Sequence, residues 1–267
     1  MMKKAVVRIL VVLLSLYILL CGFFYFFQER LIFYPAKLDN NYTFRFKQDF
    51  EEIYLKADDG TSLNSLLFKT ENPKGLIFYL HGNAGALDSW GYLASVYTDL
   101  GYDVFFLDYR GFGKSRGEID SQNQLFSDIQ LAYNEMKKRY DEDRLIVLGF
   151  SIGTGPAAKI ASVNNPHMLI LQAPYYSLTN VIQDICPVIP GFLVKYKLEI
   201  YKYVSECKMP VVIFHGNKDK VINYNNSMKL KPILKDSDLL ITLENEEHNG
   251  ITENEVYREE IKRLLTK

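Results

Sequence analysis

Short apolar runs alternate with longer amphipathic stretches along most of the chain. Runs of strand length lie at residues 75–80, 103–107, 145–148, 167–171, 211–214 and 239–243. The apolar spacing or the small residues typical of helices occur at residues 87–100, 121–140, 154–162 and 253–265. Because a strand that is apolar throughout is buried on both faces, this alternation favours a parallel sheet between helices. We therefore predict an α/β fold with a mostly parallel central sheet and helices on both of its faces.

Two segments before the first apolar run follow a different pattern, in which apolar and polar residues alternate. They lie at residues 52–56 and 62–69, on either side of the turn sequence Asp58-Asp59-Gly60-Thr61. A period of two around a glycine-containing turn is typical of a β-hairpin. The polar stretch before the hairpin, residues 40–50, is interpreted as a connection. A protein that begins near Asn40 is therefore expected to be soluble and active.

The amino terminus is almost uniformly apolar. Ile9–Phe27 contains 19 residues and no charge. As a helix it would be about 28 Å long, close to the thickness of the hydrocarbon core of a bilayer. Its last residues are large and aromatic, whereas a cleaved signal peptide ends in small residues. We predict a transmembrane anchor at residues 9–27 after a short tail at residues 1–8, with a cleaved signal peptide as the alternative.

The orientation of this anchor is predicted from the charges beside it. Lys3, Lys4 and Arg8 precede the apolar run, and a short basic tail usually stays in the cytoplasm. Arg30 and Lys37 on the other side weaken this bias. The expected product is a single-pass membrane protein whose main domain is extracytoplasmic.

The rest of the chain divides into a juxtamembrane connection at residues 28–50 and one domain at residues 51–267. One stretch inside the domain, at about residues 175–208, is too long for a simple loop and is rich in apolar and aromatic residues. We predict that it forms a small helical lid. Cys186 and Cys207 lie near its two ends. They could form a disulfide in an extracytoplasmic domain or remain buried thiols.

Charge and metal-binding residues narrow the functional classes. The formal net charge is −1, which gives no electrostatic reason to expect a nucleic-acid partner. The four histidines and three cysteines have no metal-ligand spacing. We therefore expect neither a metal nor another cofactor.

A serine stands between two glycines at the end of the apolar run at residues 145–148. Gly149-Phe150-Ser151-Ile152-Gly153 is followed at once by the small residues of a helix. On a strand-to-helix corner this pattern is typical of a nucleophile elbow, a tight turn that exposes the serine hydroxyl. The alternative, a dinucleotide-binding loop, requires an acidic residue about 20 positions further on. None occurs between Lys159 and Gln183, which excludes that alternative.

A serine nucleophile needs a base to take its proton and an acid to orient that base. In the nucleophile-elbow architecture the chain order is serine, acid, histidine. Asp219 and His248 follow this order, and both lie in loops after predicted strands. The loop at residues 81–85 follows the first buried strand, where this architecture has an oxyanion donor. The backbone N–H groups of Asn83 and Ile152 are therefore the expected donors.

Two further histidines also lie where predicted strands end. His81 begins the glycine-containing loop at residues 81–85, and His215 follows the strand at residues 211–214. We expect His81 to form hydrogen bonds within its loop and His215 to support the loop that follows it.

These motifs together resemble the α/β-hydrolase superfamily. The segments that carry the resemblance are His81–Gly85, Asp108–Ser115, Gly149–Gly153, Asp219 and His248-Asn249. With Gln28–Pro35 after the anchor, the chain resembles membrane-anchored α/β-hydrolase-domain proteins related to serine aminopeptidases and protein depalmitoylases. The resemblance implies an α/β-hydrolase fold with Ser151 as nucleophile, Asp219 as acid and His248 as base. The chain lacks the amino-terminal cysteine cluster of the depalmitoylases that face the cytosol.

The expected function is that of a membrane-anchored serine hydrolase, which cleaves an ester, thioester or amide through an acyl-enzyme on Ser151. Its substrate would be an acyl-bearing small molecule, a lipid or an acylated protein, and its anchor would bind the bilayer. An acyltransferase with the same residues is one alternative. A membrane-tethered interaction scaffold without activity is another, although a scaffold has no need of a serine, an acid and a histidine in this order.

Overall fold

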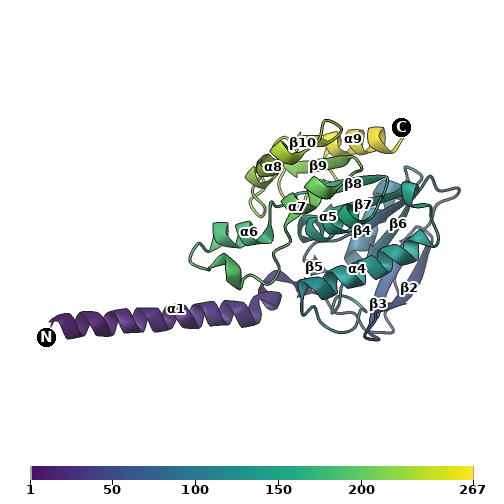
Figure 1. Ribbon diagram of the computed structural model, residues 1–267. Coiled ribbons are helices and arrows are strands. Elements are labelled where there is room, and N and C mark those ends of the chain that lie inside the picture. The colour runs from purple at the N-terminus through teal and green to yellow at the C-terminus, as the bar shows by residue number, and fades with distance from the viewer. Residues whose placement is uncertain (1, 267) are drawn as a thin grey trace.

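The protein is described by a computed structural model that covers residues 2–266. One long helix, α1 (Met2–Ile32), extends away from a domain built around a central sheet (Figure 1). The sheet has eight strands in the order β10-β9-β8-β7-β4-β6-β3-β2. Their bounds are β2 Phe50–Lys56, β3 Ser62–Phe68, β4 Leu76–Leu80, β6 Asp103–Leu107, β7 Leu145–Phe150, β8 Met168–Gln172, β9 Val211–Gly216 and β10 Leu239–Leu243.

Most of the sheet is parallel. The six strands β10, β9, β8, β7, β4 and β6 run parallel to one another, whereas β2 and β3 form an antiparallel hairpin and β3 pairs antiparallel with β6. The predictions of a mostly parallel sheet and of a preceding hairpin are both confirmed. In a parallel sheet the carboxyl ends of the strands meet at one edge, so the loops that follow β4, β7, β9 and β10 lie close together.

Helices cover both faces of the sheet, as predicted. One face packs against α4 (Gln122–Lys137), α5 (Thr154–Val163), α7 (Ile200–Glu206) and α8 (Asn225–Leu230). The other face packs against α2 (Leu87–Trp90), α3 (Ala94–Thr98) and α9 (Glu255–Leu265). Successive strand residues divide between the two cores, because side chains alternate across a strand. Phe78 and Phe105 belong to the first core, and Tyr79 and Phe106 to the second.

The single helix expected at residues 87–100 is interrupted. A 3₁₀ turn, η1 (Gly91–Leu93), separates α2 from α3. Gly91 lies against aromatic rings, and a Cβ at this position would lie 2.8 Å from the Cε1 of Phe46. Glycine is a poor helix former, and here its missing side chain leaves room for a ring from a distant segment.

The juxtamembrane connection predicted at residues 28–50 packs against the domain. Tyr34–Pro35 (β1) pairs in parallel with Ala84–Gly85 (β5). Ile32 and Phe33 are buried just before β1, and Phe44 is buried in the second core. Packing contacts of the domain therefore begin before residue 51, and the activity of a protein that begins near Asn40 stays a prediction. Polar neighbours conceal these buried aromatic residues in the sequence pattern.

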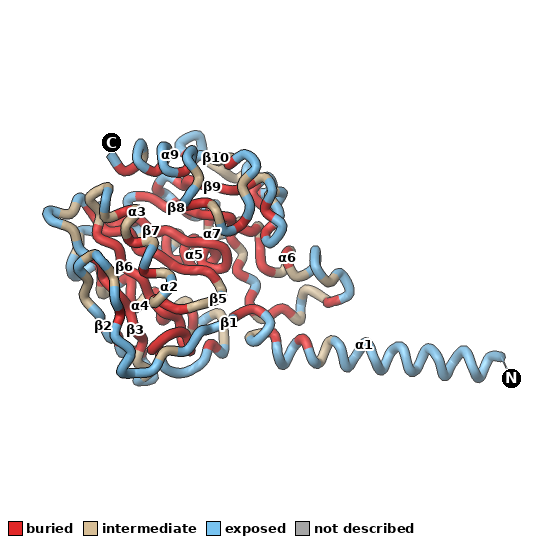
Figure 2. Tube along the Cα trace, turned by 180° about the vertical axis from the view of Figure 1, so that it is seen from behind, coloured by how far each residue is buried: buried red, intermediate tan, exposed pale blue. Residues whose placement is uncertain are grey.

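Residues 175–208, expected to form a helical lid, contain α6 (Leu178–Ile185), η4 (Gly191–Leu193) and α7. We call them the cap segment. Its last helix, α7, packs against α5, and α6 lies on the same side of the domain as α1 in both views (Figures 1 and 2). Tyr175, at the start of the cap segment, is fully buried and donates a hydrogen bond to the carbonyl of Ile152 at 3.0 Å. The cap segment is thus joined to the turn that carries Ser151.

All three cysteines are free. Cys186 packs beside α1, whereas Cys207 belongs to the core under α7. Burial raises the pKa of the Cys207 thiol to about 12, so the thiol stays protonated. The structure therefore contains no disulfide between Cys186 and Cys207, and the support that this bridge would have given to an extracytoplasmic domain is removed.

Candidate active site

Ser151 occupies a strained turn between β7 and α5. Its φ angle is 53°, in the left-handed region that residues with a Cβ rarely adopt. The chain passes from β7 through the short 3₁₀ turn η3 (Ser151–Gly153) into α5. A Cβ on Gly153 would lie 2.6 Å from the carbonyl oxygen of His81, and one on Gly149 would lie 2.7 Å from the Cβ of Ala157. The two glycines therefore make the sharp turn sterically feasible.

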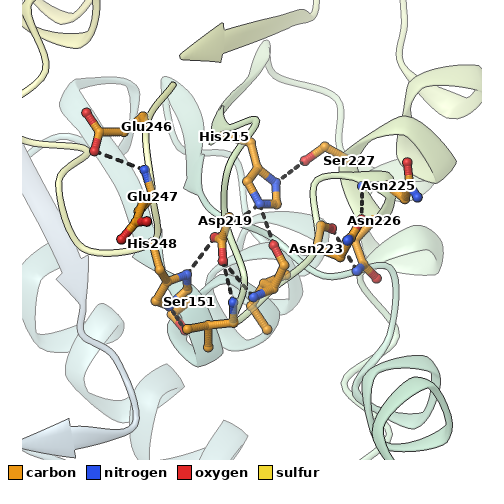
Figure 3. A network of polar contacts seen from close by, with 12 residues as sticks. Ser151, His215, Asp219, Asn223, Asn225, Asn226, Ser227, Glu246, Glu247 and His248 are labelled. Carbon is orange, nitrogen blue, oxygen red and sulfur yellow. Dashed lines mark hydrogen bonds and ion pairs between the residues drawn. The ribbon is translucent and has the colours of Figure 1, made fainter. Parts of the chain in front are cut away.

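Ser151, His248 and Asp219 form a continuous chain of hydrogen bonds (Figure 3). The Oγ of Ser151 lies 2.9 Å from Nε2 of His248, and Nδ1 of His248 lies 2.6 Å from Oδ2 of Asp219. All three residues are buried. They come from the loops after β7, β10 and β9, which explains how positions far apart in the sequence meet at one edge of the sheet. In this geometry Ser151 donates to the imidazole, and the imidazole donates to the carboxylate.

Asp219 is held as an ionised carboxylate. Burial by itself would raise the pKa of this carboxyl group, but hydrogen bonds from His215 and His248 outweigh burial and hold the pKa well below its usual range. The backbone N–H groups of Val221 and Ile222 each donate to Oδ1 at 2.8 Å. With its oxygens occupied in this way, Asp219 is fixed in position and remains charged at neutral pH, where it orients His248.

His215 supports Asp219 from the opposite side to His248 (Figure 3). Its Nε2 lies 2.8 Å from the carbonyl of Ile222 and 3.3 Å from Oδ2 of Asp219, and both partners are acceptors. Nε2 therefore carries the proton, and Nδ1 accepts from the hydroxyl of Ser227 at 2.7 Å. The expectation that His215 supports the following loop is confirmed. The partnership with Ser227 has no signal in the sequence, because the serine belongs to a different element, α8.

We predict that His215→Leu lowers kcat for a short ester by about 10- to 100-fold with little change in KM. Losing one hydrogen bond to a charged group costs about 1.5–3 kcal/mol, which corresponds to that range. His215→Gln, which keeps a side-chain N–H, should recover most of the lost kcat. Steady-state kinetics of the two variants test this role, and equal loss of kcat in both would contradict it.

The loop after β4 carries Asn83 beside the end of α1. The carbonyl of Asn83 accepts from the backbone N–H of Tyr34 at 2.8 Å, and its Nδ2 donates to the carbonyl of Ile32 at 3.0 Å. The side chain is therefore engaged by α1. Ile152 is the second residue of η3. The first N–H groups of a helical turn have no partner within the turn, so η3 itself does not use the N–H of Ile152. The oxyanion role of the two N–H groups stays a prediction.

His81 lies within the same loop, and its contacts hold that loop in place. One ring nitrogen, Nδ1, donates to the carbonyl of Gly82 at 2.7 Å, and Nε2 faces Asp108 at 3.7 Å. Burial lowers the pKa of His81 to about 4 and raises the pKa of Asp108 well above its usual value. Both shifts disfavour the charged forms of the two side chains. The hydroxyl of Tyr109 also donates to the His81 carbonyl at 2.9 Å, so the loop is fixed on several sides.

Metal-binding residues do not gather at this site or elsewhere in the described part of the chain. Within residues 2–266 no group of three or more His, Cys, Asp or Glu side chains is arranged to hold a metal ion. The candidate site thus consists of Ser151, His248 and Asp219, with the loops that carry Asn83 and Ile152.

Part of the chain is similar in sequence to known proteins. Residues 71–196 match the family model described as serine aminopeptidase, S33. The chain is 29% identical over 225 residues to the uncharacterized protein YfhR of Escherichia coli strain K12, covering 79% of this chain and 78% of the relative. It is 28% identical over 226 residues to the protein bem46 of Schizosaccharomyces pombe, covering 78% of this chain and 75% of that protein.

Solved structures agree on the fold. An esterase from Pyrococcus furiosus superposes with a TM-score of 0.68 at 19% identity, covering 88% of this chain and 96% of the esterase. The Butyrivibrio proteoclasticus protein Est1E with bound ferulic acid superposes with a TM-score of 0.63 at 20% identity, covering 80% and 96%. The chain has the α/β-hydrolase fold, which confirms the predicted fold class.

Proposed function

We propose that the protein is a serine hydrolase of the esterase type, with Ser151 as nucleophile, His248 as general base and Asp219 as the acid that orients the base. The observation that carries this proposal is the hydrogen-bond chain from Ser151 through His248 to Asp219, which begins at a residue with a φ of 53°. A strained serine is retained where its function requires it, since the same turn could be made by glycine without strain.

The reaction would proceed in two halves. Nε2 of His248 takes the proton of Ser151 as Oγ attacks the substrate carbonyl, and the negative charge that forms on the carbonyl oxygen is held by the backbone N–H groups of Asn83 and Ile152. His248 then returns the proton to the leaving group, which leaves an acyl group on Ser151. A water molecule, deprotonated by His248, releases the acid and restores the hydroxyl. Asp219 stays ionised throughout and stabilises the imidazolium.

The substrate is proposed to contain an acyl group bound as an ester, thioester or amide. Aromatic side chains lie beside the candidate site, since Phe150 packs against both His248 and Trp90. The esterase from Pyrococcus furiosus and the ferulic-acid complex of Est1E support ester chemistry on this fold. An acyl-bearing small molecule, a lipid or an acylated protein would each present the required carbonyl.

We further propose that α1 anchors the protein in a membrane. Among residues 2–266, α1 is the helix that is long and apolar enough to cross a bilayer. Most of its side chains from Val6 to Leu20 are exposed although they are apolar, which favours a lipid environment over water. The basic residues Lys3, Lys4 and Arg8 at its start favour a cytoplasmic amino terminus and an extracytoplasmic domain.

A fluorophosphonate probe tests the proposed nucleophile. Such probes react covalently with activated serine hydroxyls, so the wild-type protein is expected to be labelled at Ser151, and Ser151→Ala is expected to lose all labelling. Ser89→Ala is the matched control, because Ser89 is an exposed serine whose hydroxyl donates to the carbonyl of Ala86. Mass spectrometry of the labelled peptide identifies the site. Labelling that persists in Ser151→Ala would refute the assignment.

A further inference from the structure

The cap segment makes a set of polar contacts with the apolar helix α1. The hydroxyl of Tyr17 donates to the carbonyl of Val188 at 3.1 Å. Gln28 is fully buried, and its amide donates to the carbonyl of Leu193 at 3.1 Å and accepts from the backbone N–H of Lys195 at 2.8 Å. These contacts join positions more than 160 residues apart in the sequence, and in Figure 1 α1 passes below α6 and the loop that follows it.

Apolar contacts reinforce this attachment. Phe24 of α1 forms a small core with Ile189 and Val194, separate from the two cores of the domain. Next to it, α1 and the cap segment border an open apolar hollow of about 580 Å³. The hollow is lined by Tyr17, Ile18, Cys21, Gly22, Tyr25, Phe26, Pro190, Phe192 and Leu193. The cap segment is thus packed on the part of α1 proposed to lie in lipid.

The part of the cap segment nearest α1 contains no charged residue. We call Ile185–Val194 the cap tip; it has ten residues, and the charged Asp184 and Lys195 flank it. Three of its large apolar side chains point away from the protein, with exposed fractions of 77% for Ile185, 56% for Val188 and 81% for Phe192. A cluster of exposed large apolar side chains on a soluble surface is unfavourable and marks an interaction site.

The contacts with α1 give the depth of the cap tip. Tyr17 lies ten residues before Phe27, the last residue of the uncharged run, so the Val188 contact is about 15 Å along the helix from the domain-side end of that run. The hydrocarbon core of a bilayer is about 30 Å thick. At the domain-side end, Lys195 forms an ion pair with Glu29 at 3.1 Å. The uncharged part of the cap tip and the uncharged part of α1 therefore end at the same level, at the ion pair between Lys195 and Glu29.

Several backbone polar groups of the cap tip have partners within the protein. The carbonyl groups of Val188 and Leu193 are satisfied by side chains of α1, as described above. Pro187 and Pro190 have no N–H, and the N–H of Ile189 donates to the carbonyl of Cys186 at 3.1 Å. An irregular segment is tolerated at membrane depth only where its polar backbone groups find partners in the protein.

We propose that the cap tip inserts into the bilayer beside α1, so that the protein is held by a transmembrane helix and by a second, re-entrant contact. This inference rests on the proposed anchorage by α1. The exposed side chains of the cap tip lie alongside the uncharged part of α1. In a membrane, lipid surrounds that part of the helix wherever protein does not cover it, so lipid is also the environment that the cap tip contacts. Since α7 of the same cap segment packs on α5, which follows Ser151, insertion holds the candidate site close to the membrane surface. The acyl chains of membrane lipids are then the potential substrates nearest to the candidate site.

Tryptophan fluorescence in brominated lipid tests the insertion. The protein contains one tryptophan, Trp90, so a second one adds a signal that can be measured against wild type. Three full-length variants are compared in nanodiscs that hold a single chain: Phe192→Trp in the cap tip, Leu19→Trp in α1 and Val163→Trp at the end of α5. Leu19 and Val163 are 68% and 54% exposed, so neither substitution disturbs a core. Val163 is the last residue of α5, at the end of that helix far from Ser151, and its variant is the aqueous control.

Phosphatidylcholine brominated in mid-chain is expected to quench the added fluorescence of Phe192→Trp and of Leu19→Trp and to leave that of Val163→Trp unchanged. Acrylamide in the aqueous phase is expected to quench the added fluorescence of Val163→Trp alone. Quenching of Leu19→Trp without quenching of Phe192→Trp by bromolipid would overturn the insertion while leaving the anchorage intact. Quenching of neither would overturn both, and fluorophosphonate labelling of Ser151 would be unaffected by that result. Protection of Phe192→Trp from both quenchers would indicate a protein partner and also overturn the proposal.

Discussion

Ser151→Ala and His248→Ala are each expected to lower kcat for short p-nitrophenyl esters by about 10⁶-fold, a loss typical of residues that act as one unit. Ser151 supplies the bond-forming oxygen, and without His248 no group within hydrogen-bond distance takes its proton, because Nε2 of His248 is the partner of the Ser151 hydroxyl at 2.9 Å. The double variant should lose little more activity than either single variant. Initial rates measured with each purified variant test the prediction.

Asp219→Asn should be less damaging, with a loss of about 10⁴-fold, because it leaves the nucleophile and the base in place but removes the charge that orients His248. His167→Ala is the matched control, since His167 is exposed and outside the site, and it should retain full activity. Near wild-type turnover by Ser151→Ala or His248→Ala would contradict the mechanism, and equal loss in His167→Ala would show that the assay reports on stability instead.

Removal of residues 1–39 is expected to lower the free energy of unfolding by about 3–6 kcal/mol, whereas removal of residues 1–27 should leave a folded, active protein. The longer truncation removes Ile32 and Phe33, whose exposed fractions are 8% and 6%. Burial of each such side chain contributes about 1.5–3 kcal/mol. Against a total stability of about 5–15 kcal/mol for a typical domain, this loss is large.

The longer truncation also removes the partners of the oxyanion loop. Tyr34 and Ile32 hold the backbone and side chain of Asn83, and β1 pairs with β5 immediately after it. Any folded fraction should therefore turn over esters more slowly than the protein that begins at Gln28. Urea unfolding followed by circular dichroism, with esterase assays on the same samples, compares the two. Equal stability and activity of both proteins would show that β1 is dispensable.

Much of the fold could be predicted from local patterns. The strands β4, β6, β7, β8 and β9 are buried and consist of nearly continuous apolar runs, and strands of this kind have few alternatives to a parallel sheet covered by helices. The site residues were also accessible to prediction, because a glycine pattern at a strand end and a fixed chain order select Ser151, Asp219 and His248 among several serines, acids and histidines. In the structure His248 lies within hydrogen-bond distance of both Ser151 and Asp219.

Local patterns could not predict which distant segments pack together. A run such as Ile9–Phe27 predicts a helix that needs an apolar environment, but it does not predict that Gln28 and Tyr17 bind the cap segment. The same holds for Tyr34 beside Asn83 and for His215 beside Ser227. Hydrophobic periodicity reports that a side chain is buried and on which face of its element, and both properties depend on near neighbours in the chain. The partner in a long-range contact depends on how the chain closes in three dimensions, so only the tertiary structure decides it.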